Sequence, residues 1–381
     1  MRIDSIEATA IEIPLPRQFA GSVYAMTTRC AIVTRIRTAD GLEAEVYNGD
    51  NREHGAELVR IITEEIAPLV LGEDATAHER LWQTMFAITV PNRDRKLAME
   101  AIACVDTAVW DLLGRRAGLS VRQLLGGFRS ELPIISIGGY YAEGKTLLDL
   151  AKEMEQLRLW GMGGCKVKVG GLPPEQDAER VKAAVDGAGP GFMIAVDANR
   201  GWSVPDAIRF ARLIEHLPIA WFEEPVRWDD EARGMAEVRR ACRIPINAGQ
   251  SECSARGVRR LLDAGAVDIV NFDASEAGGI TEWRRAAAAC ALVDVRMAHH
   301  EEPQIAAQML AAIPHGICVE CFADPARDPL WPHLLPDAPR PKDGMLAVPD
   351  RPGFGIALDR AAVAKHTIAT ATATATATAR R

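Results

Sequence analysis

The feature that most constrains the fold is a series of short apolar runs, which recur at similar spacing from residue 134 onward. Eight such runs are present: IISIGGY (134–140), CKVKVGG (165–171), MIAVDAN (193–199), IAWFEEP (219–225), IPINAGQ (244–250), DIVNFDA (268–274), VRMAHH (295–300) and ICVECFA (317–323). The stretches between them, such as PDAIRFARLIEHL and SARGVRRLLDAG, carry apolar residues at the three- and four-residue spacing of amphipathic helices. Eight alternating strands and helices predict an α/β fold, a (β/α)₈ barrel of the TIM type.

The regions around the barrel have a different pattern. Residues 1–128 begin with β-rich segments and continue with helical ones, which predicts an N-terminal α+β capping domain ahead of a catalytic barrel at 129–325. The segment 326–366 contains MLAVPDRPGFGIALD, and we expect it to return to the capping domain. Residues 367–381 form a low-complexity Ala-Thr tail that we expect to be disordered.

Composition excludes several classes of protein. A formal net charge of −8 argues against a nucleic-acid partner, which would require a basic face. The chain has no apolar run of the roughly 20 residues that cross a bilayer, and its N-terminus has no signal-peptide core, so we expect a cytoplasmic protein without membrane contact. The eight cysteines are scattered, and the pair in Cys318-Val-Glu-Cys321 would face opposite ways on a strand, which favours reduced core thiols.

Ionisable and amide side chains gather where the predicted strands end. The active site of such a barrel lies at the C-terminal ends of its strands. Seven successive strands carry polar groups there: Lys166, Lys168, Asp197, Asn199, Glu223, Glu224, Gln250, Glu252, Asp273, His299, His300 and Glu320. Asp197, Glu223 and a third oxygen ligand would suit Mg²⁺, a hard cation that binds few carboxylates. The two lysines alternate with Val167 and Val169, so they point together toward a bound anion.

Two residues are candidates for the third metal ligand. Gln250 follows the fifth strand directly, and its amide oxygen is a neutral, weaker ligand. Glu252 lies two residues further on and projects to the same side if the strand continues. We expect Glu252 to be the ligand with Gln250 nearby, while a degraded metal site would leave a non-catalytic binding protein.

Together these motifs resemble the enolase superfamily, in its mandelate racemase subgroup, from residue 1 to about 360. The resemblance is carried by KVK (166–168), VDAN (196–199), WFEEP (221–225), NFDASEAGG, MAHHEEPQIAAQMLAA and AVWDLLGRRAG. It implies a modified, enolase-like barrel with a capping domain, and a homo-oligomer. The strand-five motif departs from the family's usual Gly-Glu, because Gln250 stands at the position of the glutamate.

The resemblance also implies roles for individual residues. Asp197 and Glu223 would hold Mg²⁺. Lys168 would be the base on one face of a carboxylate substrate, and His300, oriented by Asp273, would act on the opposite face. A cation is needed because an α-proton beside a carboxylate is far too weakly acidic for a side chain to remove unaided. We expect Lys166 and the metal to depress the pKa of Lys168 so that it loses its proton near neutral pH.

Other residues would contact the substrate. The resemblance implies that Lys166 and Glu320 bind the carboxylate of the substrate and that Asn199 binds one of its hydroxyl groups. Lys166 would also be one of the catalytic residues. Tyr140, at the end of the first strand, is a further candidate from its position alone. The polar segments 17–29 and 46–55, which we interpret as loops, would cap the barrel mouth.

These assignments predict a Mg²⁺-dependent hydro-lyase. It would remove a proton α to the carboxylate of a sugar acid or related α-hydroxy acid, pass through an enediolate and give a 2-keto-3-deoxy acid. The first alternative is a racemase or epimerase using the same bases, and the second is the non-catalytic binding protein. A sixth-strand lysine would instead suggest the muconate-cycloisomerase or dipeptide-epimerase subgroup, but Asp273-Ala-Ser stands there.

Overall fold

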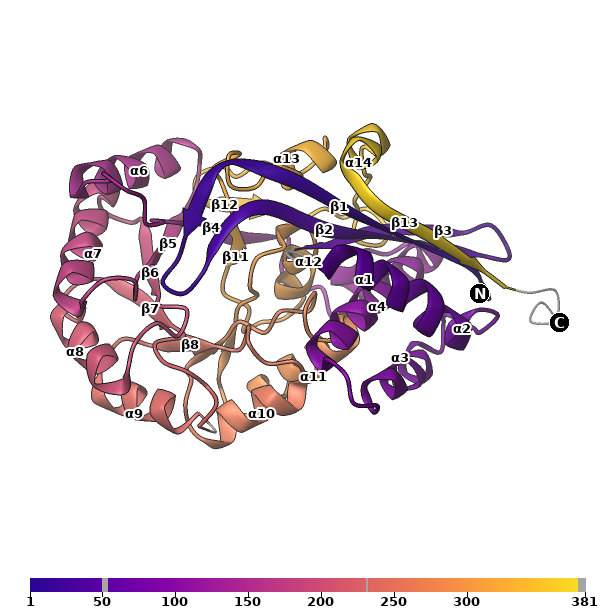
Figure 1. Ribbon diagram of the computed structural model, residues 1–381, viewed down its shortest axis with the longest axis horizontal. Coiled ribbons are helices and arrows are strands. Elements are labelled where there is room, and N and C mark those ends of the chain that lie inside the picture. Colours follow the sequence, from indigo (N-terminus) through magenta and orange to yellow (C-terminus); the bar gives the residue numbers. More distant parts are fainter. Residues whose placement is uncertain (50–53, 231, 376–381) are drawn as a thin grey trace.

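The N-terminal region is built on an antiparallel sheet with the strand order β13-β1-β2-β3 (Figure 1). The computed structural model describes residues 1–49, 54–230 and 232–375. The strands of this sheet are β1 (Ile3–Ala20), β2 (Ala25–Thr38), β3 (Glu43–Gly49) and β13 (Thr367–Thr374). The long pairing of β1 with β2 follows from runs of β-branched residues that alternate inward and outward.

Helices pack against this sheet. They are α1 (Gly55–Arg60), η2 (Ile61–Ile66), α2 (Ala67–Val70), α3 (His78–Phe86), η3 (Ala87–Thr89), α4 (Arg95–Ala117) and α5 (Val121–Leu124). The longest, α4, begins where the Asp94 side chain accepts a hydrogen bond from the backbone N–H of Leu97 at 3.1 Å, and it ends at Gly118, whose φ is +67°. A side-chain cap and a left-handed glycine are typical helix boundaries.

The second unit is the (β/α)₈ barrel that the repeat predicts, with its strands in chain order around the ring. The strands are β4 (Glu131–Gly138), β5 (Gly164–Lys168), β6 (Met193–Asp197), β7 (Ile219–Glu223), β8 (Ile246–Ala248), β9 (Ile269–Val270), β10 (Arg296–Met297) and β11 (Val319–Cys321). Parallel pairing of β11 with β4 joins one side, and a parallel bridge between Met297 and Gly316 closes the ring. The fold prediction, a barrel preceded by an α+β domain, is therefore confirmed.

An arc of helices surrounds the strands (Figure 1). It contains α6 (Leu147–Leu159), α7 (Pro174–Ala188), α8 (Val204–Ile214), α9 (Arg233–Ala241), α10 (Ala255–Asp263), α11 (Ile280–Ala291) and α12 (Pro303–Ala312), and α13 (Leu330–Leu334) and α14 (Arg360–His366) follow. A separate apolar cluster fills the barrel interior and contains Ile135, Ala195, Trp221, Ile269, Ala298 and Cys318. Val167 and Cys321 belong instead to the core outside the ring.

We expected the segment 17–29 to be a loop. The structure instead makes it part of a β-hairpin that reaches across the barrel (Figure 1). Its turn lies between β1 and β2 and is anchored to two barrel segments. The backbone N–H of Tyr141 donates to the carbonyl of Ala20 at 3.0 Å, and Ser22 Oγ donates to the carbonyl of Ala198 at 2.6 Å. The hairpin therefore fixes the capping sheet over the ends of β4 and β6.

The C-terminal region corrects two expectations. β12 (Met345–Ala347) pairs with barrel strand β4 rather than with the capping domain, although Gly353 further on does pair with Ser120 beside α5. The Ala-Thr tail is not disordered over residues 367–374, because these residues form β13 and pair with β1 (Figure 1). Alternation of alanine with β-branched threonine is itself a strand pattern, which its low complexity concealed.

The eight cysteines, all within the described residues, form no disulfide, and Cys318 and Cys321 lie on opposite sides of the barrel wall, as their spacing predicts. Within the described part of the chain, no helix combines the length and the apolar character needed to cross a membrane.

Candidate active site

Charged residues lie side by side across the ends of three neighbouring strands. In the pairing of β5, β6 and β7, Lys168 is opposite Asp197, and Asp197 is opposite Glu223. All three side chains are almost completely buried at the barrel mouth. Buried charges require partners, and the strand register supplies them here.

The two lysines are both paired with carboxylates. Lys166 Nζ lies 2.5 Å from Glu223 Oε1, 2.8 Å from Glu320 Oε2 and 3.9 Å from Asp197 Oδ2. Lys168 Nζ donates to Asp197 Oδ2 at 2.6 Å and to Asn199 Oδ1 at 3.0 Å. The inward direction of the K-x-K pair therefore brings together six of the twelve residues that the sequence singles out at this end of the barrel.

The charge state of Lys168 differs from our expectation of a depressed pKa. Burial alone would lower its pKa, but the nearby Asp197 carboxylate, with the hydroxyls of Tyr24 and Tyr140, outweighs burial and raises the pKa well above its usual range. Lys166 does not reverse this, because its own charge is shared among three carboxylates.

The carboxylates respond unequally to the same burial. Desolvation raises the pKa of Glu223 well above its usual range and also raises the pKa of Glu320. The pKa of Asp197 is lowered, because Lys168 and Lys166 outweigh the effect of burial. Glu320 Oε1 is buried and has no hydrogen-bond partner among the described residues. A raised pKa suits Glu320 to carry a proton and donate a hydrogen bond.

On another part of the ring, the imidazole of His300 lies between two carboxylates. Its Nδ1 is 3.0 Å from Asp273 Oδ2, and its Nε2 is 3.3 Å from Glu301 Oε1. Burial is the largest cause that raises the pKa of Asp273. Glu301 in turn contacts Arg29, a buried side chain of the β1–β2 hairpin, at 3.3 Å. The His300–Asp273 contact has the form of a carboxylate that orients an imidazole.

The expectation for Glu252 rests on a continuing strand, and the strand does not continue. β8 ends at Ala248, and the N–H of Glu252 donates to the carbonyl of Gly249 at 3.0 Å, which closes a turn. The Glu252 carboxylate is 2.9 Å from Arg260 Nη2 on α10. Of these two residues, Gln250 lines the central cavity at the barrel mouth. Its Oε1 accepts a hydrogen bond from Asn271 Nδ2 at 3.1 Å.

A second group of possible metal ligands includes His300. One ligand atom each from Asp273, Glu276 and His300 lies within 4.8 Å of the others. It is the only such group of three or more histidine, cysteine or acidic residues within the described ranges. Asp197 and Glu223 are not part of it.

A central cavity of about 620 Å³ lies beneath the capping domain. The residues that line it do not include Lys166, Asp197, Glu223, Asp273 or Glu320. Lys168, Asn199, Gln250 and His300 line it from the barrel. The capping domain adds residues that sequence patterns do not single out, notably Tyr24, Asp94, Lys96 and Glu100. From the sequence, Tyr24 and His54 belong only to the segments 17–29 and 46–55 that we expect to cap the barrel mouth, and residues 50–53 of the second segment lie outside the described residues.

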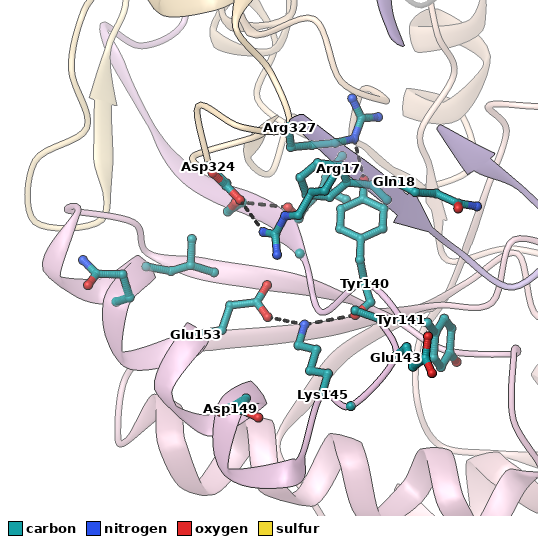
Figure 2. A pocket seen from close by; sticks show the side chains of 18 of the residues that line it. Arg17, Gln18, Tyr140, Tyr141, Glu143, Lys145, Asp149, Glu153, Asp324 and Arg327 are labelled. Atoms are coloured by element: carbon teal, nitrogen blue, oxygen red, sulfur yellow. Dashed lines mark hydrogen bonds and ion pairs between the residues drawn. The ribbon is translucent and has the colours of Figure 1, made fainter. Parts of the chain in front are cut away.

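Tyr140 lines a different cavity, of about 460 Å³, outside the barrel (Figure 2). Its hydroxyl accepts a hydrogen bond from Arg327 Nε at 3.2 Å, and its ring packs edge-on against Phe19. In this cavity, Lys145 Nζ donates to the backbone carbonyl of Tyr140 at 3.0 Å and to Glu153 Oε2 at 2.5 Å (Figure 2). The first strand ends against the hairpin, so the structure places Tyr140 among packing residues rather than among those lining the central cavity.

Comparison with known families covers nearly the whole chain. Residues 149–362 match the family described as enolase C-terminal domain-like, and residues 5–126 match the mandelate racemase / muconate lactonizing enzyme N-terminal domain. The curated relatives include the 3,6-anhydro-alpha-L-galactonate cycloisomerase of Streptomyces coelicolor, 30% identical over 94% of this chain and 97% of that protein. The arabinonate dehydratase of Saccharolobus solfataricus is 31% identical over 86% of this chain and 88% of that protein.

Solved structures show the same architecture. A mandelate racemase/muconate lactonizing enzyme from a marine actinobacterium, in complex with magnesium, is 42% identical, with a TM-score of 0.90 over 97% of this chain and 99% of that one. L-Talarate dehydratase from Polaromonas sp. JS666, complexed with Mg and L-glucarate, is 28% identical, with a TM-score of 0.89 over 98% of this chain and all of that one.

Proposed function

Because the chain belongs to the enolase superfamily, in the mandelate racemase/muconate lactonizing enzyme subgroup, we propose that it is a Mg²⁺-dependent dehydratase of an acid sugar. The observation that carries this proposal is that Lys168 and His300 line one cavity although they come from strands that are not neighbours in the ring. A substrate between them would meet one proton acceptor and one proton donor. The dehydratases among the relatives support the same reaction class.

The proposed reaction assigns one task to each side chain. Lys166 and Glu320 bind the substrate carboxylate, and Glu320 contributes a hydrogen bond from its protonated form. With Asp197 engaged as a metal ligand, Lys168 loses its carboxylate partner and releases its proton to solvent. The neutral amine of Lys168 then takes the α-proton, which leaves an enediolate. His300 donates a proton from Nε2 to the β-hydroxyl, the Cβ–O bond breaks, and water leaves. The resulting enol becomes the 2-keto-3-deoxy acid when it takes up a proton at Cβ.

The residues present fit a hard cation at Asp197 and Glu223. Both carboxylates are buried and adjacent across β6 and β7, and carboxylate and amide oxygens are the ligands that Mg²⁺ prefers. Gln250 is the third ligand that we propose, since Glu252 is bound to Arg260. Bound there, Mg²⁺ would stabilise the second negative charge that develops on the substrate carboxylate. The Asp273, Glu276 and His300 group includes an imidazole, which suits softer metals better.

Calorimetric titration with Mg²⁺ distinguishes the two groups. Asp197→Asn and Glu223→Gln should each abolish binding, Gln250→Leu should weaken it, and Glu252→Gln should leave it unchanged. Glu276→Gln is the matched control for the alternative group. Loss of Mg²⁺ binding in Glu276→Gln alone would contradict the assignment, and a wild type that binds no Mg²⁺ would favour a non-catalytic binding protein.

Turnover is tested by incubating the Mg²⁺-loaded protein with a library of acid sugars and assaying for 2-keto acid. Proton NMR in D₂O separates the reactions that share these bases. A keto product identifies dehydration, whereas α-deuterium in an otherwise unchanged or inverted substrate identifies a racemase or epimerase. Bound metal without turnover of any acid sugar would contradict the proposal.

A further inference from the structure

The charges that line the central cavity on its capping side point to the class of substrate. We infer that the substrate is a monocarboxylic sugar acid, whose end remote from the reacting carbon is neutral and hydroxylated, rather than a dicarboxylic one. The inference rests on the proposed function for the position of the reacting carboxylate beside Lys166. The rest of the substrate then extends from Lys168 and His300 toward the capping domain.

Among the described residues, Lys96 is the cation that the capping domain presents to the cavity. It lies in the first turn of α4, and its Nζ is 2.7 Å from Glu276 and 3.2 Å from Glu100. Two carboxylates therefore share one ammonium group. The Asp94 carboxylate at the start of the same helix adds a further negative charge to this wall.

Arg200 is the second cation of the lining away from Lys168. It lies 3.2 Å from Glu224, bonds Ser251 Oγ at 2.7 Å and stacks over Trp228. Its charge is thus matched by a carboxylate behind the cavity wall. Glu301, which lies 3.3 Å from His300 Nε2, shares Arg29 with Glu302 and Asp328.

The balance of these charges is negative. Among the described residues that line the cavity, the capping domain contributes one cation, Lys96, and two carboxylates, Asp94 and Glu100. Glu276 and Glu301, which lie beside His300, add two more carboxylates, and Arg200 is a further cation. A second carboxylate on the substrate would be brought toward this excess of like charge in a partly desolvated site, where repulsion is stronger than in water. Hydroxyl groups meet no such repulsion, and they can donate to the same carboxylates.

The experiment compares substrates that differ only at the remote end. D-Gluconate is paired with D-glucarate, and D-galactonate with galactarate, in the Mg²⁺-loaded wild type. Within a pair that is turned over, we expect kcat/KM to be at least tenfold higher for the monocarboxylic member. An equal or higher kcat/KM for the dicarboxylic member would overturn the inference.

A charge-neutralising variant tests the cause. Glu100→Gln should reduce the ratio of kcat/KM between the monocarboxylic and dicarboxylic members of each pair. The substitution removes one carboxylate from the cavity wall, so that Lys96 then pairs with the Glu276 carboxylate only. Glu57→Gln makes the same change of net charge on an exposed residue of α1 and should leave the preference unchanged. Equal effects of both variants would show that overall charge, and not the cavity wall, sets the preference.

Measurements of binding test this inference independently of the proposed function. If no acid is turned over, the dissociation constants of the same four compounds are measured by calorimetry in the presence of Mg²⁺. Tighter binding of the monocarboxylic members would support the inference while the proposed function fails. Tighter binding of the dicarboxylic members, or no binding of any compound, would overturn the inference as well.

Discussion

Lys168 and His300 differ in how their ionisable atoms are held. The Lys168 ammonium group is paired directly with Asp197, whereas the His300 imidazole is placed between Asp273 and Glu301. His300 Nε2 faces Glu301 Oε1 at 3.3 Å, and both residues line the cavity, so a proton on Nε2 is placed where a substrate could take it up. At the scale of the residue, this difference supports the proposed roles of Lys168 as proton acceptor and His300 as proton donor.

Replacing either residue should remove turnover without unfolding the protein. Lys168→Ala and His300→Asn are each expected to lower kcat by about 10²–10⁴-fold, the usual contribution of a positioned acid or base. Steady-state kinetics with an accepted acid sugar measures the loss, and circular dichroism checks the fold. Lys145→Ala, a lysine of the second cavity, is the matched control and should keep full activity. Unchanged turnover in both catalytic variants would refute the assignment.

His299, the neighbour of His300, has a structural environment. It is completely buried, its Nε2 accepts a bond from the N–H of Ala274 at 3.0 Å, and burial lowers its pKa to about 4. The folded protein therefore holds this ring neutral, while the unfolded chain protonates it below its ordinary pKa of 6.5. Its contribution to stability is complete above pH 6.5 and is lost as the pH falls toward 4.

The magnitude follows from the size of the pKa shift, and amounts to about 3 kcal/mol between pH 6.5 and pH 4. Urea denaturation of the wild type and of His299→Gln, whose amide oxygen can replace Nε2 as acceptor, isolates this contribution. The difference in unfolding free energy between the two should shift in favour of the variant by that amount as the pH falls. A difference that is constant with pH would contradict the buried neutral imidazole.

At the scale of elements, α4 and α11 connect the capping domain to the barrel through Asp106. Its Oδ2 accepts a bond from the N–H of Thr281 at 2.9 Å, and its Oδ1 accepts one from Thr281 Oγ1 at 2.7 Å. α11 begins after Gly279 and has no side-chain cap of its own, so a residue of α4 satisfies its first turn. Burial raises the pKa of Asp106 to about 7.

Asp106→Ala should lower the free energy of unfolding by about 1–3 kcal/mol, because it leaves a buried donor of α11 without its acceptor. Asp106→Asn should cost less, since the amide oxygen can still accept one bond and the neutral group avoids the cost of a buried charge. Chemical denaturation measures both variants. Equal losses for alanine and asparagine would show that packing, and not the hydrogen bond, is what Asp106 contributes.

At the scale of the whole molecule, the two ends of the chain complete one sheet. β13 pairs with β1 from Ser5 to Ile11, and Thr9 and Thr370 share a hydrogen bond of 2.8 Å between their hydroxyls. The first and last strands of the fold thus depend on each other, and β13 covers an edge of β1 that would otherwise be open to pairing with another chain.

Truncation after His366 should therefore destabilise the protein by about 2–4 kcal/mol, the sum of several backbone hydrogen bonds, and promote association through β1. Truncation after Ala375, which keeps β13, is the control. Denaturation curves and light scattering measure stability and association. If the two truncated proteins behave alike, β13 does not contribute to the sheet.

Local patterns were sufficient to predict the barrel. Strand and helix periods repeat within a few residues, and alternation in the K-x-K run determines that Lys166 and Lys168 share a face whatever surrounds them. The strand ends then follow from the parallel topology, which brings the groups on β5, β6 and β7 to one edge. The same topology places Asp273 and His300, which follow β9 and β10, at this end of the barrel as well.

Tertiary structure decided the features that depend on partners remote in the sequence. The turn at Gly249 directs Glu252 toward Arg260, β1 makes a strand of the Ala-Thr tail, and the hairpin covers Tyr140. The Lys96–Glu276 pair joins the capping domain to the barrel. Sequence spacing cannot specify such contacts, because the energy of a side chain at these positions is set by groups that only the folded chain brings within a few ångströms.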